Sequence, residues 1–229
     1  MRITWLGHSG FRLEIGEQIL LIDPWLAGNP AFPEERRPQA IEGATAILLT
    51  HGHGNHASNA ASIAAKLGVP IACIHELSES PALSAAECIG FGKGGTIRFG
   101  DVRVTMVNAV HSSSVDFSDE LGVAGSEAGF IIRGEDRCIY VSGDTDVMAD
   151  MGWIGEYYEP DIGILCCGGH YTMDIDAAAW AAKRFFDFKT VIPCHYGTFP
   201  ILAQSAEPLA AALPGIDVRL PNVLEPFEI

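Results

Sequence analysis

Short segments of alternating polar and apolar residues dominate the first part of the chain. Residues 3–6, 11–15 and 18–22 follow this pattern and are separated by glycine-containing turns. The pattern predicts three strands with one buried face each. The stretch 28–43 is rich in Pro, Glu and Arg, so we expect an exposed loop there.

The pattern then changes to alternating strand and helix. Residues 46–49 are wholly apolar, as in a strand buried on both faces. The alanine-rich stretch 56–67 predicts a helix that ends at Gly68, and residues 69–74 predict the next strand.

The second part of the chain repeats this order, with two hairpins first and alternating strands and helices after them. The predicted segments are residues 96–99 with 102–108, 128–133 with 138–141, 162–166, 175–186, 190–193 and 205–213. Two similar halves, each a sheet with helices on one face, would pack sheet to sheet as an α/β fold of four layers, an αββα sandwich. Because no linker interrupts the pattern, we expect one domain over residues 1–229.

Composition narrows the functional classes. Of the 229 residues, 48% are hydrophobic and 19% are charged, which is typical of a folded protein. The formal charge of −15 argues against a nucleic-acid partner, because a phosphate backbone is bound by basic surfaces. The chain shows no signal peptide and no apolar run long enough to span a bilayer, and its six cysteines form no CxxC pair. We therefore expect a cytoplasmic protein with no membrane partner.

A cluster of histidines carries the strongest chemical signal. His51, His53 and His56 lie in the sequence Thr-His-Gly-His-Gly-Asn-His, directly after the buried strand 46–49 and before a helix. A loop in that position can direct several imidazoles to one point, and neutral imidazole is a good ligand for zinc and similar ions. The cluster predicts a metal site; exposed or helix-capping histidines are the alternative.

Other ligand-type residues follow other strands. His111, Asp144 and His195 each come shortly after a predicted strand ends. Each alone is compatible with a turn or a helix cap. In α/β folds, however, binding sites gather beyond the carboxyl ends of strands, so these three positions and the histidine cluster together predict one shared site.

These motifs give the chain a resemblance to the metallo-β-lactamase superfamily. The HxHxxH cluster, a lone His, Gly-Asp-Thr and a late strand-end His occur in the family's order over almost the whole chain. The motifs at residues 5–11, 111–114, 168–173 and 192–199 add a similarity to its uncharacterised metal-dependent hydrolases, whose relatives include the L-ascorbate-6-phosphate lactonase type. The resemblance implies the four-layer metallo-β-lactamase fold.

The resemblance also implies two divalent metal ions. The expected ligands are His51, His53 and His111 at the first site, Asn55, His56 and His195 at the second, and Asp144 at both. Zinc suits a histidine-rich site, and manganese, nickel or iron are alternatives. A metal-bound hydroxide would then attack an ester, lactone, amide or phosphodiester bond of a small-molecule substrate.

Four more residues receive expected roles from the same resemblance. His8 and His170 would lie near the metals as catalytic or substrate-binding residues, with a structural role as the alternative. Thr172 would line the substrate pocket or pack under the next helix, and Asp23 would orient a ligand histidine.

Asn55, a metal-ligand and catalytic position, departs from the family pattern, which has Asp there. A neutral amide would weaken the second metal site and remove a proton acceptor. A metal-binding protein with weakened or lost catalysis is therefore the alternative to a hydrolase. Redox chemistry at a di-iron site is less favoured, because His53 stands where such proteins carry an acidic ligand. A homo-oligomer is compatible with the sequence.

Overall fold

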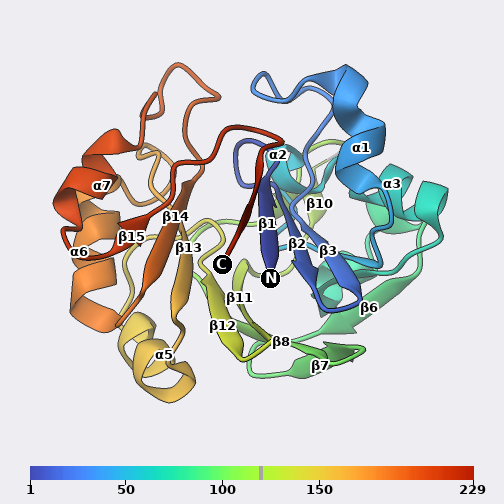
Figure 1. The fold of residues 1–229 in the computed structure, drawn as a ribbon. Helices are drawn as coiled ribbons and strands as arrows, with labels where there is room; N and C mark the ends of the chain where they lie inside the picture. The colour runs from blue at the N-terminus through green and yellow to red at the C-terminus, as the bar shows by residue number, and fades with distance from the viewer. Residues whose placement is uncertain (119–120) are drawn as a thin grey trace.

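Two sheets lie face to face between two outer layers of helices in the computed structural model, which describes residues 1–118 and 121–229 (Figure 1). Within the described residues each sheet has seven strands. The expected αββα sandwich is confirmed.

The first sheet is antiparallel on one side and parallel on the other. In spatial order its strands are β16 (Pro226–Glu228), β1 (Arg2–Trp5), β2 (Phe11–Ile15), β3 (Gln18–Ile22), β4 (Ala46–Leu48), β5 (Ile71–Ile74) and β6 (Cys88–Phe91). The pairs from β16 to β3 are antiparallel and those from β3 to β6 are parallel. The alternation in β2 is visible in burial, since Phe11, Leu13 and Ile15 are buried while the residues between them are partly exposed.

The second sheet repeats this arrangement. Its strands, in spatial order, are β15 (Asp217–Val218), β14 (Thr190–Cys194), β13 (Ile162–Cys166), β12 (Arg137–Val141), β11 (Ala128–Gly134), β8 (Val102–Asn108) and β7 (Thr96–Phe99). The strands from β7 to β12 pair antiparallel, and those from β12 to β15 pair parallel. A small ribbon of β9 (Ser114–Val115) and β10 (Gly122–Val123) stands apart from both sheets.

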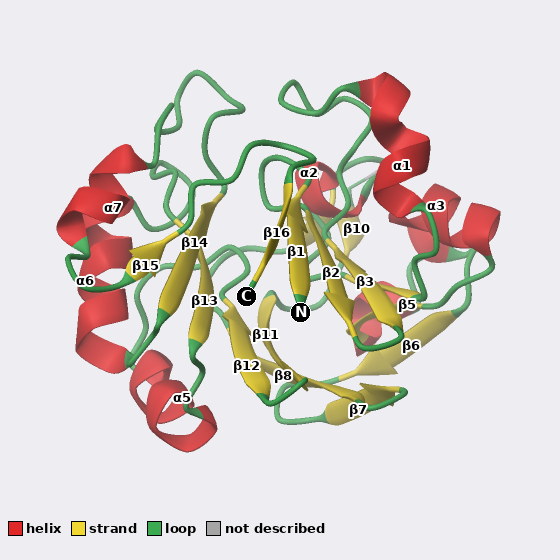
Figure 2. Ribbon diagram, viewed as in Figure 1, coloured by secondary structure: helices red, strands yellow, loops and turns green. Residues whose placement is uncertain are grey.

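Helices cover the outer faces of the two sheets (Figure 2). On the first sheet these include α1 (Arg37–Ile41) and α3 (Ala60–Leu67), and on the second they are α5 (Asp150–Tyr158), α6 (Ile175–Phe185) and α7 (Glu207–Ala212). Short helices η1 (Glu34–Arg36), α2 (Gly54–Ala57), α4 (His75–Ser78) and η2 (Pro81–Leu83) lie in the connections. None of the helices that the structure describes has the length and apolar character that crossing a bilayer requires.

The helix predicted over residues 56–67 is divided into two, and this division serves the site. Between α2 and α3, the side chain of Asn59 accepts hydrogen bonds from the backbone N–H groups of Leu26 (2.7 Å) and Ala27 (2.6 Å). The break therefore ties the histidine segment to the loop that follows β3. The end of α3 at Gly68 agrees with the prediction, because Gly68 has the left-handed φ of 68° common at helix ends.

Other differences have local causes. The loop predicted at 28–43 contains η1 and α1, which form in spite of the prolines because Pro38 stands in the first helical turn. Helix α5 was not predicted, because two glycines weaken its helical pattern. One of them is required by packing: a Cβ on Gly155 would lie 1.9 Å from the carbonyl oxygen of Phe185 in α6.

Candidate metal centre

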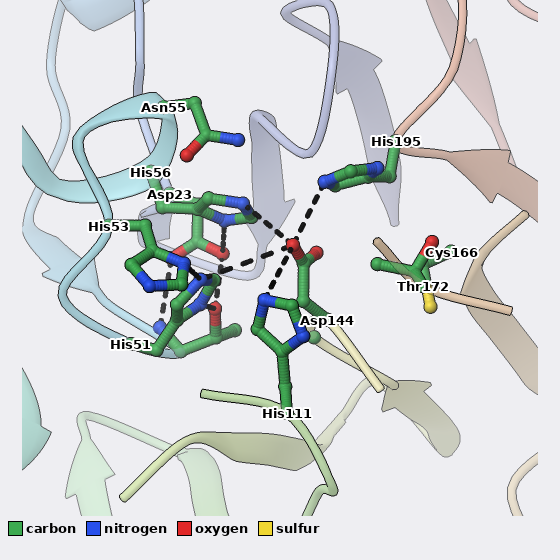
Figure 3. A network of polar contacts seen from close by, with 12 residues as sticks. Asp23, His51, His53, Asn55, His56, His111, Asp144, Cys166, Thr172 and His195 are labelled. Carbon is green, nitrogen blue, oxygen red and sulfur yellow. Dashed lines mark hydrogen bonds and ion pairs between the residues drawn. The ribbon is translucent and has the colours of Figure 1, made fainter. Parts of the chain in front are cut away.

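Ligand-type side chains meet where strands of both sheets end (Figure 3). The first sheet supplies those that follow β1, β3 and β4, and the second supplies those that follow β8, β12 and β14. They are His8, Asp23, His51, His53, His56, His111, Asp144 and His195. The sheets therefore place these side chains at the same edge of the sandwich.

Asp144 lies at the centre of this cluster. Its Oδ2 atom lies 2.9 Å from His195 Nε2, 3.2 Å from His56 Nε2, 3.8 Å from His111 Nε2 and 4.0 Å from His51 Nε2 (Figure 3). The carboxylate is 2% exposed. One buried oxygen thus lies within reach of four imidazoles, two from each half of the chain.

The histidines form two groups on either side of Asp144. In one, the ligand atoms of His51, His53 and His111 lie within 4.8 Å of one another. In the other, those of His8, His56 and His195 do so. The first group matches the expected first site; the second contains His8 in addition to two expected ligands.

Asp23 orients two imidazoles of the cluster, those of His56 and His51. Its carboxylate accepts hydrogen bonds from Thr50 N (2.8 Å), Thr50 Oγ1 (2.6 Å) and His56 Nδ1 (2.9 Å). Because Thr50 Oγ1 donates to Asp23, it accepts from His51 Nδ1 at 3.0 Å. The Nε2 atoms of His56 and His51 are thereby left to face Asp144, as expected of histidines that bind metal.

Burial sets the protonation of most of these imidazoles. It is the largest cause that lowers the pKa of His8 and His51 well below the ordinary value, and neighbouring imidazoles add to it. Burial also lowers the pKa of His53 and His111, with less effect because these side chains are half-buried. Four imidazoles are therefore held in the neutral form that binds metal ions.

His56 and Asp144 behave in the opposite way. Burial opposes the charge on His56, but Asp144 and Asp23 outweigh it and raise the pKa of His56 to about 10. Burial likewise opposes ionisation of Asp144, yet His195 and His56 keep the pKa of this carboxyl well below its ordinary value. The two shifts have one cause, because the charges of His56 and of the carboxylates beside it stabilise each other.

The residues present fit a divalent cation. Asp144 Oδ1 is buried without a hydrogen-bond partner among the described residues. Buried polar atoms are normally satisfied, so an unpaired carboxylate oxygen among imidazoles indicates a missing partner. A carboxylate with several neutral imidazoles is a donor set suited to zinc and other transition metals.

Strained backbone accompanies the cluster. His8, Asp23 and His195 have φ values of 52°, 43° and 60°, in the left-handed region that residues with side chains seldom adopt. Each such residue costs about 1–3 kcal/mol, and such residues concentrate at functional sites. The strain suggests that these positions are selected for where their side chains point.

A cleft of about 730 Å³ opens above Asp144. Its apolar walls are Trp25, Phe117, Tyr171, Phe199 and Ile201. The polar lining contains, besides the ligand-type residues, Ser58, Ser112, Asn55 and Asp116. None of the described lining residues is Lys or Arg.

His170 and Thr172 do not join the cluster. His170 is exposed and its ring packs against Tyr171, with ring centres 4.4 Å apart. A tight turn in which Tyr171 N donates to Gly169 O (2.7 Å) directs His170 outward, so its expected place beside the metals is not observed. Thr172 lies beside Cys166 and outside the cleft lining, which agrees with packing rather than with substrate binding.

Asn55 lines the cleft, but the hydrogen bond of its side chain is to His8, another residue predicted for the site. Its Nδ2 donates to His8 Nε2 at 2.8 Å. Sequence reasoning missed Trp25, Phe199 and Thr198 as site residues. The last two belong to the strand-end motif at 192–199, which was a usable signal.

Known proteins resemble the chain over its whole length. A family model described as a β-lactamase superfamily domain matches residues 2–195. The chain is 60% identical to a protein of Paracoccus denitrificans named UPF0173 metal-dependent hydrolase, and 58% identical to one of the same name from Dinoroseobacter shibae, with 100% of each chain covered. Among solved structures it is similar to Igni18, a metallo hydrolase from Ignicoccus hospitalis, with 29% identity, a TM-score of 0.86 and coverage of 100% of this chain and 98% of that one.

Proposed function

The chain belongs to the metallo-β-lactamase superfamily as a metal-dependent hydrolase, and from this premise we propose that it cleaves an ester, lactone or amide bond of an uncharged small molecule with an apolar or aromatic group. The observation that carries the proposal is the position of Asp144 and its imidazoles at the floor of a cleft with apolar walls. The likeness to the L-ascorbate-6-phosphate lactonase type stays a prediction of the sequence.

We further propose two divalent ions, with zinc as the first candidate. His51, His53 and His111 would hold one and His56 and His195 the other, with Asp144 between them and Asn55 beside the second. When bound, such ions supply an activated water molecule and polarise the bond under attack. The protein's part is to fix the direction of these imidazoles, which Asp23 and Thr50 support.

The cleft walls favour an apolar substrate group. Trp25 and Phe199 stack with ring centres 5.7 Å apart, next to the cluster. Tyr171 and Ile201 are more than half exposed at the rim, where a ligand would cover them. Burial of such side chains against a ligand contributes about 25 cal/mol per Å² of apolar surface.

The same cleft disfavours a phosphorylated or phosphodiester substrate. Besides metal ions, phosphate recognition commonly uses Arg, Lys or backbone N–H groups at a helix start, and no Arg or Lys is found in the described lining. Asp116 adds a negative charge there, and the whole chain carries a formal charge of −15.

A comparison of substrates tests the proposal. With zinc or manganese loaded, we expect kcat/KM for para-nitrophenyl butyrate to exceed that for bis-para-nitrophenyl phosphate by about 100-fold, an effect of about 2.7 kcal/mol. Faster turnover of the phosphodiester would reject the substrate class. No turnover of any ester, lactone or amide by a fully loaded protein would support the metal-binding alternative that Asn55 suggests.

Phe199 provides a sharper test of the cleft. Phe199→Ala should raise KM about 10-fold for an ester that carries a phenyl group, while KM for the corresponding ester without the phenyl group changes little. Tyr157→Ala is the matched control, because Tyr157 is 74% exposed on α5 and does not line the cleft.

A cytoplasmic location, the absence of a nucleic-acid partner and a homo-oligomeric state stay predictions of the sequence.

A further inference from the structure

We propose that His8 is the third histidine ligand of the second metal site. His8, His56 and His195 would then together hold the second ion, which in a site with a carboxylate at position 55 that carboxylate would help to hold. This inference rests on the proposed two-ion centre and assigns one of its ligands. It replaces the sequence-based expectation that Asn55 holds the second ion and that His8 contacts substrate.

The position of His8 fits a ligand better than a substrate contact. Its side chain is completely buried and does not line the cleft. Its ring centre lies 4.1 Å from that of His195 and 5.6 Å from that of His56. The ligand atoms of the three residues lie within 4.8 Å of one another, so a single ion between them is geometrically accessible.

The hydrogen bonds of His8 leave one ring nitrogen available. Asn55 Nδ2 donates to His8 Nε2 at 2.8 Å, so Nε2 carries a lone pair and the proton is on Nδ1. His8 Nδ1 then donates to Thr198 Oγ1 at 2.7 Å. A metal-binding histidine characteristically donates its other N–H group in this way, which fixes the tautomer and the ring direction.

Asn55 therefore forms a hydrogen bond to the His8 ring and does not take the place of His8 as a ligand. Its amide donates to the same lone pair that an ion would use, and an ion would take the place of that hydrogen bond. An aspartate at this position could not donate such a bond. The neutral amide is thus consistent with a site in which the third ligand is a nitrogen from another strand end.

The backbone ties His8 to its fellow ligand His195. The carbonyl oxygen of His8 accepts hydrogen bonds from His195 N (3.0 Å) and Trp5 Nε1 (3.0 Å). These bonds hold His8 in its left-handed conformation, with φ at 52°. A residue of low strain would suffice if this position served packing alone.

Metal binding by variants tests the inference without any substrate. Zinc content after equilibrium dialysis, and the visible spectrum of the cobalt-loaded protein, report each site. We expect two ions per chain in the unchanged protein. In His8→Ala the first ion should be retained, while affinity for the second falls about 100-fold or more; Thr198→Val should lower it about 10-fold, through the lost orientation of the ring.

Two variants distinguish the loss of a metal ligand from a general disturbance of the site's structure. Asn55→Ala should keep the second ion with little change in affinity, and His170→Ala, which alters an exposed histidine outside the cluster, should match the unchanged protein. If His8→Ala folds poorly, His8→Gln provides a milder change, and retention of the first ion reports correct folding.

The outcomes are distinct from those for the hydrolase proposal. Full second-site affinity in His8→Ala and His8→Gln, loss of the second ion in Asn55→Ala alone, or a single ion in the unchanged protein would overturn the assignment of His8. Two ions bound through His8 without turnover would keep this assignment and reject only the proposed reaction.

Discussion

At the scale of single residues, Asp23 shows how strongly the centre depends on a side chain that need not touch an ion. It is 1% exposed and accepts three hydrogen bonds, from two groups of Thr50 and from His56. Because Thr50 in turn orders His51, one carboxylate sets the direction of a ligand in each histidine group.

Asp23→Asn should therefore weaken both metal sites and the fold. The amide presents one acceptor where three donors point, so at least one buried donor loses its partner at a cost of about 1–3 kcal/mol. We expect metal affinity about 10–100-fold lower by chelator competition, and a lower urea midpoint. Asp101→Asn, at an exposed hairpin turn, removes the same charge and should change neither; equal effects of the two variants would contradict this role of Asp23.

Asn55→Asp should strengthen the second site. The added carboxylate brings a negative charge to a place where three imidazoles meet, and an ion there would gain a charged ligand. We expect about 10-fold tighter binding of the second ion and higher activity on whichever ester or lactone the protein cleaves. Unchanged metal content and unchanged activity would show that position 55 does not influence that site.

The residue scale also sets a limit on prediction from sequence. His8 and His170 both follow a glycine and both have positive φ, of 52° and 59°. One is buried against His195 and the other is exposed beside Tyr171. The difference arises from contacts across about 190 residues for His8 and from a local turn for His170, and no neighbouring residue reveals which applies. The clustering of the histidines at 51–56 was predictable because their spacing is itself local.

At the scale of elements, the turn after β12 places Asp144. Gly143 has a φ of 61°, and a Cβ there would lie 2.4 Å from the carbonyl oxygen of Ala128. The carboxylate can therefore leave the strand and enter the cluster only because the preceding residue lacks a side chain.

Gly143→Ala should destabilise the protein by about 3 kcal/mol, from an unfavourable φ and a contact with backbone that cannot move aside. Gly16→Ala is the matched control, since Gly16 has a similar φ of 57° with nothing within 4 Å, and it should cost only about 1 kcal/mol. Urea unfolding with an unchanged slope measures both. Equal midpoints in the two variants would mean that the close approach to Ala128 is of no consequence.

The predictability of the elements follows from burial. Strands β2, β4, β13 and β14 were predictable because their residues alternate or are wholly apolar. Strands β6, β15 and β16 lie at sheet edges and are only partly buried, so their sequences show no such signal. Pairing with an already formed strand, not sequence pattern, makes these segments extended.

At the scale of the whole molecule, the cluster joins the two sheets. Asp23, His51 and His56 come from the first, and Asp144 and His195 come from the second. An ion held by residues from both sheets would stabilise only the folded state, because the unfolded chain does not present these residues together.

Removal of metal should therefore lower the melting temperature. At about 100 times the dissociation constant, a bound ion stabilises the folded state by about 2.7 kcal/mol, which for a chain of 229 residues corresponds to about 5–10 °C. Calorimetry with and without a chelator measures the shift, and Asp144→Asn should abolish most of it. The same melting temperature with and without the chelator would show that the ions do not link the sheets.

The distribution of ligands along the chain has a consequence for biosynthesis. Of the proposed ligands His195 is the last in the sequence, and its neighbour across the centre, His8, comes before all the others. A nascent chain that ends before His195 would lack a complete cation cage, however well its earlier segments have folded. With the proposed centre, the full complement of ions would be bound late, from whatever metals the surroundings then offer, and the identity of the ion would reflect supply as much as the chemistry of its ligands.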